Sequence, residues 1–168
     1  MDARRGSEPG PTNRTSMELR EDREIVITRT FNGPARVVFD AWTNAELVKR
    51  WWAPKSLGVS MSSCDADVRV GGKYRYVLRP SGGDEVAFSG TYTEITPYSR
   101  LVYTSCLEPF PDPVIVTVTF EEKDGKTHLV ARELYPSKEV REMALASGME
   151  VGMRETWEQL DELVASLR

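Results

Sequence analysis

The sequence is short of several residue types, and each shortage excludes a class of site. Its 168 residues include two cysteines, Cys64 and Cys106, and a single histidine, His128. A structural zinc site needs about four nitrogen or sulfur ligands, and these cysteines have neither CxxC spacing nor histidine neighbours. We therefore expect no metal site and two free thiols. A catalytic triad built on histidine would have to use His128.

The chain also lacks basic charge and long apolar runs. It carries 22 Lys and Arg against 26 Asp and Glu, a formal net charge of −4. Nucleic acid calls for a basic stripe, so we expect no nucleic-acid partner. No apolar run approaches the roughly 20 residues of a membrane span, and no secretory signal is evident. These absences predict a cytoplasmic protein with one globular domain and no membrane span.

The sequence divides into a tail and a folded part. Residues 1–23 hold few apolar side chains among Gly, Pro, Ser, Thr and mixed charges, so burial cannot offset the entropy of ordering them. We expect a disordered tail there, followed by one folded domain over 24–168. No motif in the domain indicates a cofactor.

Hydrophobic periodicity predicts an α+β fold. A strand over 24–31 is followed by a helix that begins after Pro34 and by a second short helix with a capping box from Thr43 to Glu46. A long helix begins near Ser137 and continues to the C-terminus, with Gly148 marking a break in it or a close approach to the sheet. Between the short helices and the long one, the period of two and the turn residues predict strands over 59–67, 72–79, 85–96, 100–107, 113–123 and 126–135. About seven strands then form a curved antiparallel sheet wrapped around the C-terminal helix, leaving a concave space suited to a ligand.

Several motifs carry a resemblance to a known family. They are FNGPARVVFDAWTN (31–44), WWAP (51–54), CDADVRVGGKY (64–74), GTYTEITPYSRLVYT (90–104), VTVTFEE (116–122) and GMEVGMRETWEQLDEL (148–163). The chain resembles the START-like, or SRPBCC, superfamily with its helix-grip fold, in the branch of homologues of the activator of heat-shock protein ninety ATPase. The resemblance covers about 24–168 and implies this fold. It departs at Ala53, where the family usually has Gly, and at Glu133, where an apolar residue is common.

The resemblance implies less about function. The family includes carriers of lipids and small molecules, aromatic polyketide cyclases and domains that stimulate a chaperone. The fold does not distinguish among these functions, so the function must be argued from the residues of the site.

Alternation along the strands places one set of side chains on the concave face. This set consists of several tyrosines and apolar residues, which either fill the core or line a pocket that orients a ligand. Trp51 and Trp52 lie where the second short helix meets a Pro-containing loop. Adjacent residues on a helix point about 100° apart, so one is expected in the core and the other over the cavity entrance. The candidate ligand-binding residues are Trp51, Tyr74, Tyr76, Phe88, Tyr92, Tyr103, Val118, Leu129, Glu133, Met149, Met153 and Trp157.

Glu133 is the polar exception in this set. If Leu129 faces inward, alternation places Glu133 inward as well, and a buried carboxylate must be paired or neutralised. We favour a shift near the strand end that brings Glu133 to solvent or to Arg154. A single carboxylate makes no catalytic constellation, so we name no catalytic residue.

These observations favour binding of a small apolar or aromatic molecule in an internal cavity, without assigned catalysis. One alternative is an interaction module that stimulates a chaperone ATPase, with a chaperone as partner. Another is a cyclase-like enzyme acting on a hydrophobic substrate. The sequence does not identify the ligand or the oligomeric state.

Overall fold

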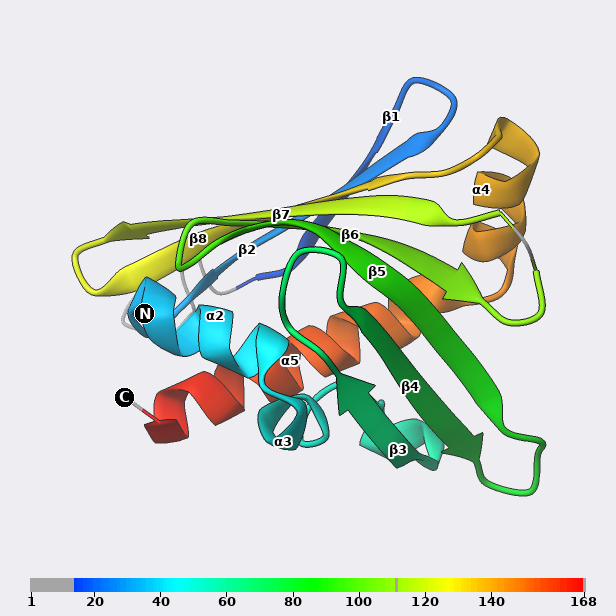
Figure 1. The fold of residues 1–168 in the computed structure, drawn as a ribbon, viewed down its shortest axis with the longest axis horizontal. Coiled ribbons are helices and arrows are strands. Elements are labelled where there is room, and N and C mark those ends of the chain that lie inside the picture. Colours follow the sequence, from blue (N-terminus) through cyan, green and yellow to red (C-terminus); the bar gives the residue numbers. More distant parts are fainter. Residues whose placement is uncertain (1–13, 111, 168) are drawn as a thin grey trace, which may run out of the picture.

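A computed structural model describes residues 14–110 and 112–167, which form one curved antiparallel sheet with helices on its concave side (Figure 1). The strands are β1 (Ser16–Arg20), β2 (Glu24–Phe31), β3 (Val59–Ala66), β4 (Lys73–Pro80), β5 (Val86–Thr96), β6 (Arg100–Leu107), β7 (Val114–Lys123) and β8 (Lys126–Leu134). Their order across the sheet is β1-β2-β8-β7-β6-β5-β4-β3. Of these pairings, the β2–β8 pairing alone joins strands that are not consecutive in the chain. The boundaries predicted for β2 to β8 each agree to within one residue.

The helices are α2 (Ala35–Thr43), α3 (Ala45–Val48), the 3₁₀ helix η2 (Lys55–Leu57), α4 (Lys138–Ala146) and α5 (Met149–Leu167). In Figure 1, α5 runs beneath the arch of the sheet, with α2 and α3 beside it. This is the predicted α+β helix-grip arrangement. No helix in the described ranges is long and apolar enough to cross a bilayer.

The predicted tail is wrong for residues 16–20. Ser16–Arg20 forms β1, an edge strand in which Met17 pairs with Ile27 of β2. Backbone hydrogen bonds to the neighbouring strand stabilise an edge strand of this kind. A count of apolar side chains does not include these bonds. The rest of the predicted tail, residues 1–13, lies outside the described residues.

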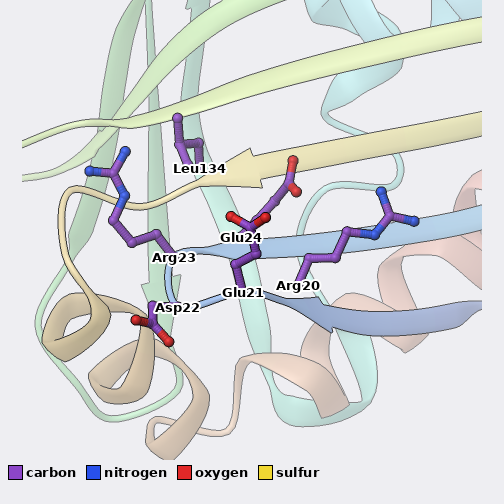
Figure 2. A pocket seen from close by; sticks show the side chains of 6 residues that line it. All are labelled: Arg20, Glu21, Asp22, Arg23, Glu24 and Leu134. Carbon is purple, nitrogen blue, oxygen red and sulfur yellow. The ribbon is translucent and has the colours of Figure 1, made fainter.

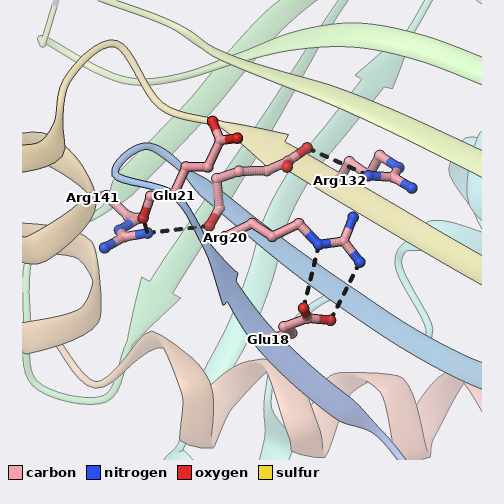
Figure 3. A network of polar contacts seen from close by, with 6 residues as sticks. Glu18, Arg20, Glu21, Arg132 and Arg141 are labelled. Atoms are coloured by element: carbon pink, nitrogen blue, oxygen red, sulfur yellow. Dashed lines mark hydrogen bonds and ion pairs between the residues drawn. The ribbon is translucent and has the colours of Figure 1, made fainter.

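A buried arginine joins the β1–β2 turn to α4. The guanidinium of Arg141 donates through Nη1 to the carbonyl oxygens of Glu21 and Glu24, at 3.1 and 3.3 Å (Figure 3). Arg141 is 5% exposed, and a hydrogen bond to a charged donor contributes more than a neutral one. Arg20 lies nearby on β1 and pairs with Glu18 at the surface.

Three helix boundaries can be compared with the sequence expectations. Asn44, not Thr43, caps α3: its side chain accepts from the backbone N–H of Glu46 at 2.9 Å, while Thr43 donates to a carbonyl within α2. Ser137 caps α4 by accepting from Val140 N–H at 3.1 Å, as the predicted start implies. Gly148, with φ of +85°, breaks the long helix into α4 and α5, because glycine adopts this conformation without steric cost.

The core lies between the sheet and α5. Trp157 is 4% exposed, and its ring contacts Phe31 and Trp42 at centroid distances of 5.9 and 5.6 Å. Leu160 and Val164, three and seven residues further along, have no exposed surface. This spacing confirms that one face of α5 is buried against the sheet.

Candidate functional site

Four tyrosines form a continuous aromatic surface on the concave face, which we call the tyrosine wall: Tyr74 and Tyr76 on β4, Tyr92 on β5 and Tyr103 on β6. The ring centroid of Tyr74 lies 4.8 Å from that of Tyr76, 5.5 Å from Tyr92 and 5.7 Å from Tyr103. The first three are buried and Tyr103 is half-buried. Strand alternation correctly predicts that all four share one face.

The hydroxyls of the wall have partners within the protein. Tyr74 donates to the carbonyl oxygen of Thr104 at 2.7 Å, and Tyr103 accepts from the indole N–H of Trp42 at 3.4 Å. The other two tyrosines share a hydrogen bond. Burial raises the pKa of all four hydroxyls, so each stays neutral at physiological pH. The wall therefore offers ring faces rather than unused hydroxyls.

The two neighbouring tryptophans have different surroundings, as predicted, although α3 ends at Val48 and both lie in the turn after it rather than on the helix. Trp51 is 2% exposed and donates through its indole N–H to the carbonyl oxygen of Ala41 at 2.8 Å. Trp52 is half-buried, and its ring lies edge-on to Tyr76 and Phe88, at 5.0 and 5.2 Å. Trp51, the tryptophan among the candidate site residues, is thus in the core. Trp52 is the one that reaches the tyrosine wall.

Two polar side chains of α5 hold the tryptophan loop, residues 51–56, in place. Gln159 donates through Nε2 to two carbonyl oxygens of this loop, both at 2.9 Å. The carboxylate of Glu155 accepts from the backbone N–H and the hydroxyl of Ser56, at 2.7 and 2.6 Å. The position of Trp52 over the wall therefore depends on contacts with α5 that the sequence analysis missed. A glutamine on a buried helix face is the only sequence signal for them.

Glu133 faces the concave side of the sheet. It pairs in register with Ile25 of β2 and Val116 of β7, both buried, and no register shift occurs along β8. Arg154 pairs with Glu150 instead, at 2.8 Å. The strand-end shift that we favour from the sequence is therefore wrong, because pairing with strands on both sides fixes the orientation of β8.

Burial raises the pKa of the Glu133 carboxyl. Its Oε1 accepts a hydrogen bond from the hydroxyl of Tyr135 at 2.9 Å, which opposes part of that rise. The same hydroxyl lies 3.8 Å from the sulfur of Met149 on α5. Glu133 is nevertheless half-buried rather than sealed, so some of its surface is accessible to water.

The remaining candidate residues fall into two groups. Val118, Leu129 and Trp157 are core residues, exposed by 0%, 0% and 4%. Met149 and Met153 on α5 are half-buried, and they pack against the core with part of their surface free. Phe88 and Trp52 lie next to the wall, through Tyr76. Met149 contacts the hydroxyl of Tyr135.

Two surface depressions lie elsewhere. One of about 400 Å³ sits at the β1–β2 turn, where Figure 2 shows mostly charged side chains: Arg20, Glu21, Asp22, Arg23, Glu24 and Leu134. The other, of about 270 Å³, is lined by Arg29, Asn32, Glu158, Asp161, Glu162 and Ala165. Neither contains a candidate residue. Within the described residues, no three His, Cys, Asp or Glu side chains are grouped to hold a metal ion.

Solved structures share this fold. A protein from Rhodobacter sphaeroides superposes with a TM-score of 0.83 at 23% identity, covering 92% of this chain and 99% of that chain. A protein from Nitrosomonas europaea superposes with a TM-score of 0.78 at 24% identity, covering 88% of this chain and 97% of that chain. A Plasmodium falciparum protein described as an HSP90 activator gives 0.53 at 27% identity, covering 67% of this chain and 73% of that one.

A family match covers most of the domain. No curated protein matches this chain. Residues 32–165 match the family described as activator of Hsp90 ATPase homolog 1-like protein, a span that includes α2, the tyrosine wall, Glu133 and nearly all of α5. The chain therefore belongs to the activator of Hsp90 ATPase homolog 1-like family.

Proposed function

We propose that the protein binds a small apolar or aromatic molecule between the concave face of the sheet and the first turns of α5. One observation carries this proposal: Tyr103 and Glu133 lie deep on the concave face, each between buried partners on both neighbouring strands, yet both keep accessible surface. Protein interiors are otherwise packed as densely as organic crystals. A residue that is deep and still accessible therefore indicates a space that side chains leave unfilled.

The surroundings of this space support a ligand of that kind. Half-buried Trp52 and Phe88 supply apolar surface next to the tyrosine wall, and half-buried Met149 and Met153 supply it at the start of α5. Methionine adapts its shape to different ligands, and binding sites are mostly apolar with a few polar groups. Glu133 is the polar group here.

A cavity-filling variant tests the proposal. Fatty acids, flavonoids and aromatic polyketides would be titrated into labelled protein, with amide shifts and the melting temperature as readouts, because binding to the folded state raises stability. Met153→Trp should weaken binding at least tenfold. Val151→Trp is the matched control, since Val151 is 63% exposed on the same helix and should leave binding unchanged. The proposal fails if no compound binds at millimolar concentration, or if both variants behave alike.

A second candidate function is stimulation of a chaperone ATPase. The family match favours it, together with the likeness to the Plasmodium falciparum HSP90 activator. Such a module would act through its outer surface, so Met153→Trp should leave stimulation intact. The test is the ATPase rate of an Hsp90-type chaperone with and without this protein. An unchanged rate rules this candidate out.

A further inference from the structure

A row of paired residues leads across the concave face from the tyrosine wall to Glu133. Tyr92 pairs with Tyr103, Tyr103 with Val116, and Val116 with Glu133. The row crosses β5, β6, β7 and β8, and directly opposed residues in an antiparallel pair have Cβ atoms about 5 Å apart. Tyr103 and Glu133 are therefore two strand spacings, about 10 Å, apart on the same face.

The carboxyl of Glu133 has one oxygen that is not used within the described part of the protein. Its Oε1 holds the Tyr135 hydroxyl, whereas Oε2 has no hydrogen-bond partner among the described residues. Oε2 is also not one of the fully enclosed polar atoms that lack a partner, so it retains accessible surface. An accessible acceptor in a deep position is available to a ligand.

Glu133 also lacks a counter-ion in the part of the chain that the structure describes. The nearest candidate from the sequence, Arg154, is bound to Glu150 and to the carbonyl oxygen of Thr15. A carboxylate removed from water without a cation is unfavourable, and proteins normally pair it. A bound cation would supply the missing charge.

The aromatic surface that begins at Tyr103, two strands from Glu133, favours the same kind of ligand. Ammonium groups are attracted to the faces of Tyr and Trp rings, and the attraction grows when water is excluded. Tyr103 is the wall residue that is both deep and accessible, and Met149 approaches the Tyr135 hydroxyl from the helix side. A carboxylate at one end of an aromatic surface matches a molecule with an ammonium at one end and an apolar or aromatic body.

We propose that the ligand class is an apolar or aromatic amine, whose ammonium pairs with Glu133 while its hydrocarbon body lies along Tyr103 toward the wall. This inference rests on the proposed function, because it names the ligand class for the same space. It makes Glu133 the residue that sets specificity, whereas the wall sets affinity for the apolar body.

A pair of nearly isosteric probes tests the inference. 3-Phenylpropylamine and 3-phenylpropan-1-ol have the same body and differ in the charge of the terminal group. Each would be titrated into the whole chain at pH 7.5 by calorimetry, with amide shifts on β6, β8 and α5 to locate binding. We expect the amine to bind about tenfold or more tightly than the alcohol, as a hydrogen-bonded charge pair implies.

Two variants separate a local effect from overall charge. Glu133→Gln keeps the shape and should remove the preference for the amine while leaving the alcohol affinity unchanged. Glu94→Gln removes the same formal charge at an exposed ion pair with Arg100, and should keep the preference. The comparison of the two probes on the unmodified chain stands even if a variant folds poorly.

The outcomes distinguish the two proposals. Equal affinity for amine and alcohol, with shifts at the site, overturns the amine inference and leaves the apolar site standing. A preference for the alcohol, or for 3-phenylpropanoate, also overturns it, because a protonated Glu133 would then bind an acceptor. Binding of none of the probes at millimolar concentration overturns the proposed function, and the inference with it.

Discussion

The contact between Gln159 and the tryptophan loop provides the sharpest test of the architecture. Gln159→Ala removes the hydrogen bonds from Nε2 to the carbonyl oxygens of Trp51 and Ala53, and the one that Oε1 accepts from Lys55 N–H at 3.1 Å. Trp51 and Ala53 are buried, so their carbonyl oxygens lose partners that water does not readily replace.

The expected loss of unfolding free energy follows from these three hydrogen bonds. A net contribution of about 1 kcal/mol each sums to about 3 kcal/mol, and alanine regains a few tenths through its higher helix propensity. We therefore expect the free energy of unfolding to fall by about 2–3 kcal/mol, measured by urea denaturation. Glu158→Ala, an exposed neighbour on α5, should change it by less than about 0.5 kcal/mol.

A second measurement follows the position of the tryptophan loop. Releasing the loop should shift the indole N–H signal of Trp52 in an amide-correlation spectrum, while that of Trp157 in the core stays in place. A loss below about 0.5 kcal/mol, with the Trp52 signal unmoved, would refute the idea that α5 positions the loop.

Three further outcomes are expected. Trp157→Ala should cost about 3–5 kcal/mol in unfolding free energy, as large core truncations do, and a loss under about 1 kcal/mol would place this face of α5 in solvent. Because burial raises the pKa of Glu133, the folded state keeps the proton of this carboxyl over a pH range in which the unfolded state has lost it. The free energy of unfolding should therefore fall as the pH rises from about 4.3 through the folded pKa, and Glu133→Gln should remove this pH dependence. Parallel pH profiles for the two proteins would contradict the assignment. Burial raises the pKa of the Cys64 thiol to about 11, so iodoacetamide at pH 8 should label it only after unfolding; rapid labelling of the native protein would show an open position.

Local pattern was sufficient for most of the fold. Alternation and turn residues located β2 to β8, because the period of two and the residues that favour turns are properties of short segments. The same alternation placed the tyrosine wall on one face. Helical spacing also predicted that one of two adjacent tryptophans would be buried.

The features that matter for the site depended on contacts between distant segments. Strand β1 forms because β2 offers a free edge for backbone pairing. The composition of residues 14–23 gives no information about that edge. The choice between Trp51 and Trp52 followed from the position of the loop against Gln159, more than a hundred residues away in sequence. For Glu133, alternation allowed an inward position, but pairing with β2 and β7 on both sides decided it. Sequence by itself determined the elements and their faces, since these are set by neighbouring residues. Tertiary structure alone decided which polar group lies deep with no cation beside it among residues 14–110 and 112–167, because burial depends on what the rest of the chain packs around it.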